Sequence, residues 1–158
     1  MIRLNDTDPG FKYELAAVPG GEGIRVCFGC GACSARCQVA GHHPDYDPRR
    51  IIRMVLMGMR AEVLASPLIW LCSTCYNCHE VCPQGVGFAE VLAAITNLAV
   101  AEGKGPASAG AVKNLLASQG RLLEVSEFEN EKRTKMGLAE VEGVVEEIGA
   151  LLGGEEGR

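Results

Sequence analysis

Apolar residues recur at helical spacing along most of the chain, and no segment alternates convincingly as a strand would. One amphipathic stretch follows Asp47-Pro48, where an N-cap residue precedes proline at the first helical position. Gly58 indicates that this helix ends nearby. Its predicted apolar face comprises Ile51, Ile52, Val55, Leu56 and Met59, widened by Met54 and Met57.

Two more helices are predicted around the centre of the chain. A short one over residues 60–65 precedes Ser66-Pro67, which repeats the cap-and-proline signal. A longer one begins at Phe88 and ends at Glu102-Gly103, because glycine commonly terminates helices. Its apolar stripe consists of Phe88, Val91, Leu92, Ile95, Leu98 and Ala99.

The last third of the chain begins with a glycine-rich linker at residues 103–106. A helix is predicted over 108–118, with Val112, Leu115 and Leu116 inward, and residues 119–137 are polar and mixed. A final segment has heptad-like spacing and glutamates elsewhere, and since two heptads are marginal alone, we expect it to dock onto the core or another subunit. Its apolar positions are Leu138, Val141, Val145, Ile148 and Leu152.

These elements predict a mainly all-α fold with three parts. Residues 1–25 contain strong turn signals around one short apolar piece, so we expect an irregular lead-in that wraps the core or a partner. Residues 26–105 form the central domain, and residues 106–158 form a C-terminal helical docking segment.

Composition fits this organisation. A chain of 158 residues with 47% hydrophobic content can bury one core, but aromatic residues make up only 5%, so bulky prosthetic groups are expected to supply part of the interior. The net charge is −5. Residues 1–120 carry ten acids and ten bases, so the net charge lies in the remaining tail. This balance gives no reason to expect binding to nucleic acid or a membrane.

The basic residues gather after the first cysteines. A solvated helix face is the favoured interpretation of this cluster, and compensation of a negatively charged metal centre is the alternative. The cluster comprises Arg36, Arg49, Arg50, Arg53 and Arg60.

The first ten residues hold two aspartates and no apolar core, so they resemble neither a secretory signal nor a transit peptide. We therefore expect a cytoplasmic location. No stretch approaches the roughly 20 apolar residues that a membrane span needs.

All eight cysteines fall in two runs with the same C-x2-C-x2-C-x3-C spacing, offset by 45 positions. This spacing is a signature of cysteine-ligated iron–sulfur clusters, and we expect two [4Fe–4S] clusters that carry electrons. Gly29 and Gly31 lie between ligands of the first run, where a loop around a cluster needs unusual backbone angles. Pro83 follows the second run, whereas Gln38 follows the first. The runs are Cys27, Cys30, Cys33, Cys37 and Cys72, Cys75, Cys78, Cys82.

Two other uses of the cysteines fit this spacing less well. Disulfides fit poorly, because the expected compartment is reducing and cysteines two residues apart would close strained loops. Zinc is the stronger rival, but its sites usually combine two separated C-x2-C pairs, whereas here a third and fourth cysteine follow at once.

The duplicated pattern also predicts which cysteine binds which cluster. In two-cluster ferredoxins the fourth cysteine of each run ligates the other cluster. We therefore expect crossed ligation that interlocks the two runs. The first cluster takes Cys27, Cys30, Cys33 and Cys82, and the second takes Cys72, Cys75, Cys78 and Cys37.

Other chemistry is not indicated by the sequence. The histidines at 42, 43 and 79 are not needed as ligands, although His79, inside the second run, could tune a cluster through a hydrogen bond. No Ser/His/Asp arrangement, phosphate-binding loop or nucleotide fingerprint is evident. We therefore expect no catalytic residues and no substrate site on this chain.

The chain resembles the C-type subunit of heterodisulfide reductase in three features. These are the two cysteine runs, the Trp70-Leu71 pair before the second run, and the Gly85-Val86 turn with the apolar helix that follows it. The resemblance covers roughly residues 25–105. It implies an α-helical ferredoxin fold with a long helical segment between the runs, a fold shared with other respiratory and sulfur-metabolising complexes.

The resemblance also implies partners. In that family, the C-type subunit links an A-type subunit with flavin and iron–sulfur centres to a catalytic B-type subunit, whose CCG domains reduce the disulfide of coenzymes M and B in methanogens. The expected function is thus a non-catalytic electron-transfer subunit of an oxidoreductase complex. The alternatives are a freely diffusing dicluster carrier, the wire subunit of another oxidoreductase, and a redox or iron sensor.

Overall fold

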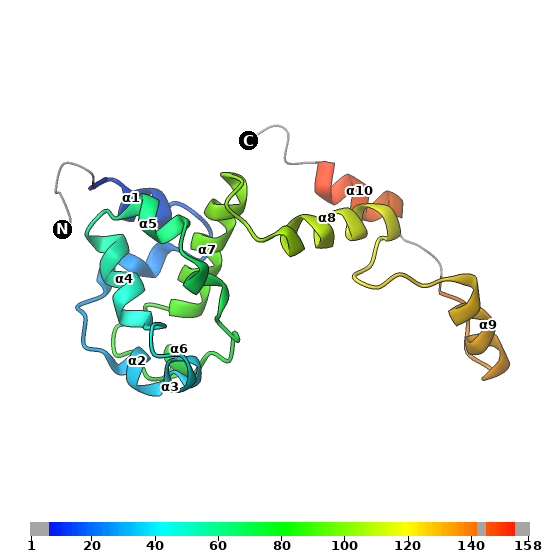
Figure 1. The fold of residues 1–158 in the computed structure, drawn as a ribbon, viewed down its shortest axis with the longest axis horizontal. Coiled ribbons are helices and arrows are strands. Elements are labelled where there is room, and N and C mark those ends of the chain that lie inside the picture. The colour runs from blue at the N-terminus through cyan, green and yellow to red at the C-terminus, as the bar shows by residue number, and fades with distance from the viewer. Residues whose placement is uncertain (1–6, 142–144, 154–158) are drawn as a thin grey trace. The chain divides into compact units, whose positions relative to one another are not determined.

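The computed structural model describes residues 7–141 and 145–153, and within these ranges the chain is helical and has no strand (Figure 1). The predicted all-α class is confirmed. The chain divides into two compact units, Met1–Gly105 and Pro106–Arg158. The first unit contains α1 (Phe11–Ala16), η2 (Glu22–Val26), α2 (Ala32–Arg36), α3 (Gln38–His42), α4 (Pro48–Leu56), α5 (Arg60–Leu64), η3 (Pro67–Trp70), α6 (Asn77–Glu80) and α7 (Phe88–Ala101), where η denotes a 3₁₀ helix.

Helix α7 is the centre of the first unit, because most of its side chains are apolar. It packs against α1, η2, α5, η3 and α6, and it ends at Ala101, with Glu102 as its C-cap, before Gly103 turns the chain with φ of 71°. The predicted helix from Phe88 to Glu102-Gly103 is therefore confirmed. Its buried residues are Phe88, Ala89, Val91, Leu92, Ala94, Ile95 and Ala99.

Helix α4 begins where the sequence predicted. Asp47 accepts a hydrogen bond from the backbone N–H of Arg50, and Pro48 occupies the first turn. Met57, counted with the apolar face, is instead 53% exposed, because it follows the last helical residue and turns toward solvent. Helix α5 and the 3₁₀ helix after Ser66 also match their predicted starts.

The N-terminal lead-in is more regular than expected. It contains α1 and η2, and the side chains of Phe11, Leu15 and Ile24 are fully buried in the core shared with α4 and α7. The reason is tertiary: six helical residues are marginal alone and gain their stability from the face they bury.

A close backbone contact fastens the lead-in to the turn after α4. The N–H of Asp8 donates to the carbonyl oxygen of Gly58 at 2.7 Å. Gly58 has φ of 75°, and a Cβ there would lie 2.3 Å from the carbonyl oxygen of Asp8. Only glycine fits this position without a shift of the backbone.

An ion-pair network joins α1, α5 and the end of α7. The guanidinium of Arg60 donates two hydrogen bonds of 2.8 Å to the carboxylate of Glu14 and also contacts Glu102. Lys104 donates to the other oxygen of Glu102 at 2.7 Å. Arg60 therefore has structural carboxylate partners, which corrects its assignment to a solvated helix face.

The second unit contains α8 (Ala107–Gln119), α9 (Glu127–Lys135) and α10 (Val145–Gly153), and α10 packs on α8. Helix α9 lies in the segment that was predicted to be polar and mixed, although Ser126 and Glu129 form the capping box that marks its start. Val112, predicted to point inward, is 45% exposed. The final helix is shorter than predicted, since Leu138 and Val141 precede it in non-helical chain and residues 142–144 lie outside the described residues.

Within the described ranges, no helix combines the length and apolar character required to cross a membrane.

Candidate metal centre

The cysteine runs lie at one end of the first unit. Helices α2, α3 and α6, which carry or flank cysteines, gather there, while α1 and α5 lie at the opposite end (Figure 1). In the first run Cys27 follows η2 in extended chain, Cys33 lies in α2, and Cys37 separates α2 from α3. Helix α2 packs against both α6 and α4, so the two runs are brought together.

The two runs share an unusual backbone conformation. Gly29 and Gly31 have φ of 77° and 85°, and the residues 45 positions later, Thr74 and Tyr76, have φ of 50° and 59°. These two are the only non-glycine residues with positive φ in the described part of the chain. The glycines of the first run were predicted to serve this purpose, but nothing in the residue types of the second run indicated it.

Eight cysteines surround two adjacent spaces. We call these spaces cavity 1 and cavity 2. Cys78 and Phe88 line both, so they form the wall between them. The other cysteines lining cavity 1 are Cys27, Cys30, Cys33 and Cys82, and those lining cavity 2 are Cys37, Cys72 and Cys75.

This arrangement suits a group with volume better than a single ion. A zinc ion needs four ligands converging on a point, with sulfur about 2.3 Å away. Among the described residues, no three His, Cys, Asp or Glu side chains converge in that way. The cysteines instead line spaces between helices, and a set of thiol ligands around such a space fits an iron–sulfur cluster.

Backbone amides already point at two of the sulfur atoms. The N–H of Thr74 donates to Sγ of Cys72, and the N–H of Val86 donates to Sγ of Cys82, both at 3.4 Å. Such bonds stabilise negative charge on a ligand sulfur, and they are among the factors that set cluster potentials.

The titration of the thiols follows their environment. Burial raises the pKa of Cys33, and burial raises that of Cys78 to about 11, whereas a backbone hydrogen bond from Asn77 lowers the pKa of Cys75. Because ligation requires thiolates, loading the site releases protons from the buried cysteines.

None of the residues lining the two cavities is a histidine. His79 instead lies 3.3 Å from Glu90 of α7, measured from Nδ1 to Oε1. This contact directs the imidazole toward α7. The sequence-based suggestion that His79 tunes a cluster directly stays a prediction.

The arginines after the first run divide into several roles. Arg49 lines cavity 1 and lies over Gly31, so it faces the centre and not only solvent. Arg36, Arg50 and Arg53 are exposed. The backbone N–H of Arg49 also donates to Ser34 in α2, whose hydroxyl donates to Asp47. The start of α4 is thereby tied to the first cysteine run.

A buried tyrosine that no feature of the sequence placed at the centre also lines cavity 2. Tyr46 is 2% exposed, and burial and the neighbouring Cys72 raise its pKa, so its hydroxyl stays protonated. Its position before the Asp47-Pro48 cap could have drawn attention to it, but no pattern in the sequence pointed to the cavity.

Comparison with known proteins places this centre in context. Residues 23–86 match a family model described as a 4Fe-4S dicluster domain. This match and the eight cysteines establish that the chain holds two [4Fe–4S] clusters.

Several relatives align over most of the chain, and each is the C-type subunit of its enzyme. One is the C-type subunit of the H(2):CoB-CoM heterodisulfide,ferredoxin reductase of Methanothermobacter thermautotrophicus. It is 31% identical, and the alignment covers 89% of this chain and 75% of the relative. The iron-sulfur C-type subunit of the CoB--CoM heterodisulfide reductase of Methanopyrus kandleri is 32% identical, with 89% and 77% covered. That of the Ferredoxin:CoB-CoM heterodisulfide reductase of Methanosarcina mazei is 34% identical, with 88% and 91% covered.

Proposed function

The chain belongs to the family of C-type subunits of heterodisulfide reductase, and on that premise we propose that it relays electrons between two partner subunits of a heterodisulfide reductase-like complex. The donor side is an A-type subunit with flavin and iron–sulfur centres, and the acceptor side is a disulfide-reducing B-type subunit with CCG domains. The observation that carries this proposal is the pair of cysteine-lined cavities that share one wall.

The two clusters are assigned by crossed ligation. Cavity 1 receives the fourth cysteine of the second run, Cys82, and cavity 2 receives the fourth cysteine of the first run, Cys37, which supports the exchange. Cys78 lines both cavities and is assigned to cavity 2 by its place in the second run. The proposed ligands are Cys27, Cys30, Cys33 and Cys82 for cluster 1, and Cys72, Cys75, Cys78 and Cys37 for cluster 2.

When bound, the clusters supply sites that accept and release single electrons. The chain's own residues hold these sites next to one another and limit the access of water. Phe88 is 2% exposed and stands between the cavities, while Ile52 and Val86 close the inner side of cavity 1. The amides of Thr74 and Val86 stabilise charge on one ligand of each proposed cluster.

Disulfide chemistry is assigned to another chain. The sequence has no adjacent cysteine pair and no cysteine after Cys82, and all eight cysteines are used as ligands. Catalysis at a heterodisulfide therefore requires a partner with its own cysteine-rich site. We further propose that the complex works in the cytoplasm.

The test is anaerobic purification of the native complex through this chain, with iron, sulfide and flavin counted. About eight irons per chain are expected from two four-iron clusters, together with flavin-containing and cysteine-rich partners. A chain that carries eight irons but purifies as a monomer, and that exchanges electrons with many donors, would favour the freely diffusing carrier.

A further inference from the structure

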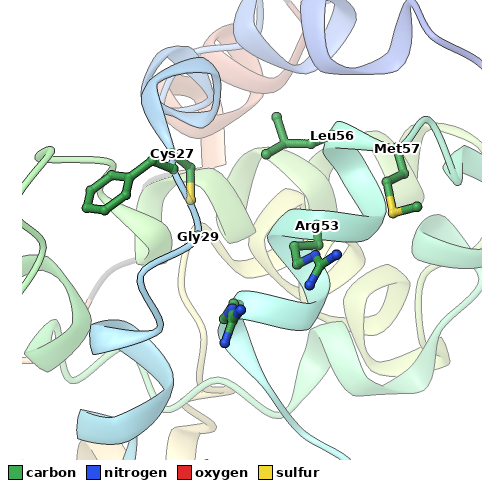
Figure 2. Close-up of a pocket in the computed structure, with 7 residues that line it drawn as sticks. Cys27, Gly29, Arg53, Leu56 and Met57 are labelled. Atoms are coloured by element: carbon green, nitrogen blue, oxygen red, sulfur yellow. The ribbon is translucent and has the colours of Figure 1, made fainter.

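An open groove adjoins cavity 1 on the surface of the first unit. We call it the basic groove, and Figure 2 shows Cys27 on one side of it and Arg53, Leu56 and Met57 of α4 and its end on the other. Cys27 lines both the basic groove and cavity 1, so a proposed cluster ligand is reached directly from this surface. The residues lining the groove are Cys27, Phe28, Gly29, Arg49, Arg53, Leu56 and Met57.

Apolar side chains stand in solvent at this groove. Phe28, which lies between Cys27 and Gly29, is 64% exposed, and Met57 is 53% exposed. A large aromatic ring and a flexible thioether are side chains that protein interfaces favour. Their grouping beside a redox centre indicates a surface that another protein covers.

The charged side chains that line the groove are all cationic. Among the described residues, no carboxylate forms an ion pair with Arg49, Arg50 or Arg53. The adjoining surface includes Asp47, which already accepts hydrogen bonds from Ser34 and from the backbone of Arg50, and the exposed Asp45 lies beside Arg50. Three arginines without an ion-pair partner attract a negatively charged partner surface and speed its approach.

We propose that the basic groove docks the redox partner that exchanges electrons with cluster 1, through a partner surface that is acidic around an apolar centre. The proposal rests on the proposed function and adds which face is used and what chemistry meets it. Apolar contact with Phe28 and Met57 sets the residence time, while Arg49, Arg50 and Arg53 set the association rate.

The experiment uses the cluster-loaded full chain and the partner subunits separated from the wild-type complex. Arg53→Glu is compared with Lys12→Glu, the same charge reversal on α1, which does not line the groove. At low salt we expect Arg53→Glu to slow association at least tenfold, with the difference shrinking at high salt, and Met57→Ser to speed dissociation. Iron content and potentials of each variant establish that the clusters are intact.

The outcomes separate two failures. Partner binding by wild type with unchanged association of Arg53→Glu overturns the groove and leaves the proposed function standing. Equal slowing by Arg53→Glu and Lys12→Glu also overturns it, because the effect is then one of net charge. Absence of any partner binding by the wild-type chain overturns the proposed function and the groove together.

A second inference rests on a different observation, the buried hydroxyl of Tyr46. The side chain is 2% exposed, and its hydroxyl has no hydrogen bond of normal geometry with a described residue, although Cys72 is its polar neighbour. A buried hydroxyl without a well-formed hydrogen bond destabilises the fold. The ring lines cavity 2 together with Cys37, Cys72 and Cys78.

We infer that the hydroxyl of Tyr46 donates a hydrogen bond to a sulfur atom of the group held in cavity 2, either the thiolate of Cys72 or an inorganic sulfide. A donor at sulfur stabilises the extra negative charge of the reduced state, so it raises the potential of that cluster alone. Tyr46 is thus a positioning and tuning residue, and it is not a ligand.

The test is redox titration of the cluster-loaded Tyr46→Phe variant, followed by electron paramagnetic resonance so that the two clusters are resolved. One midpoint potential is expected to fall while the other stays at the wild-type value. Tyr13→Phe, which changes a 54% exposed tyrosine outside both cavities, serves as the control. Unchanged potentials in Tyr46→Phe at full iron content would overturn the inference.

A measurement on the wild-type protein covers the case in which Tyr46→Phe loses iron. Transfer into heavy water replaces the hydroxyl proton and also that of the exposed Thr74 amide, which donates to Sγ of Cys72, so two deuterium couplings to one reduced cluster are expected. Labelling with ¹⁵N identifies the amide coupling, and a coupling from the amide alone would overturn the inference without the variant.

Discussion

Thr74 and Gly29 occupy the same position in the two cysteine runs, and both adopt the left-handed backbone conformation, with φ of 50° and 77°. A β-branched residue is strained there, whereas glycine is not. We expect Thr74→Gly to slow cluster loss in denaturant, with a stabilisation of about 0.5–1 kcal/mol once the extra entropy of glycine is counted. The rate of cluster loss is measured from the decrease in the visible absorbance of the clusters.

The reciprocal change provides the control. Gly29→Thr meets no atom within 4 Å of its Cβ, so its cost comes from backbone strain alone, about 1–2 kcal/mol. Faster cluster loss in Thr74→Gly than in wild type would contradict this account and would assign the threonine side chain a role of its own.

Crossed ligation predicts which cysteine variants resemble one another. Cys30→Ser and Cys82→Ser should disturb the same cluster signal in electron paramagnetic resonance, and Cys37→Ser and Cys75→Ser should disturb the other. The physical reason is that each cavity is lined by cysteines of both runs. If Cys37→Ser instead matches Cys30→Ser, each run holds its own cluster and the assignment is wrong.

Gly58→Ala tests the contact between the lead-in and the turn after α4. The added methyl group would lie 2.3 Å from the carbonyl oxygen of Asp8, at a residue with φ of 75°. We expect a loss of about 2 kcal/mol or more, measured as the free energy of unfolding or as accelerated cluster loss. Gly41→Ala, a helical glycine with nothing within 4 Å of its Cβ, should be neutral or slightly stabilising.

The Glu14–Arg60–Glu102 network predicts a pH dependence. Hydrogen bonding to Arg60 lowers the pKa of Glu14, and hydrogen bonds from Lys104 and Arg60 lower the pKa of Glu102, below the ordinary value of 4.5. A carboxylate whose folded pKa is lowered stabilises the fold above its unfolded pKa and loses this effect as pH falls through the folded value.

Glu14→Gln should therefore destabilise the chain by about 1 kcal/mol at pH 7, since the pair is bidentate but partly exposed. The difference from wild type should shrink below about pH 4.5. Glu62→Gln, on the exposed side of α5, should show no such difference. Each variant is compared with wild type at the same pH, because the loss of clusters in acid affects all of these proteins alike. A difference that persists undiminished at low pH would count against the network.

Truncation after Gly105 should leave both clusters in place. All eight cysteines and all residues of the buried core lie before this position, and the chain divides into its two units there. We expect about eight irons in the shortened chain, as in the full one. A chain ending at Ala94 is the matched control: it lacks Ile95 and Ala99 of the core, so it should lose iron. Loss of iron on removal of residues 106–158 alone would show that the second unit supports the centre.

The sequence by itself determined the local features of this protein. Cysteine spacing specified the iron–sulfur chemistry, and the Asp47-Pro48 and Gly103 signals located helices α4 and α7, because capping and helix termination depend on neighbouring residues. The capping box at Ser126 was equally readable, and the prediction of a mixed segment there overlooked it.

Only the tertiary structure decided the long-range relationships. Four of them depend on residues distant in the chain. These are the burial of Phe11 and Ile24, the approach of Asp8 to Gly58, the left-handed conformation of Thr74 and the position of Tyr46 in cavity 2. Periodicity identifies the face that a helix buries but not its neighbour. A strained residue or an unpartnered hydroxyl is tolerated only because packing elsewhere holds it there.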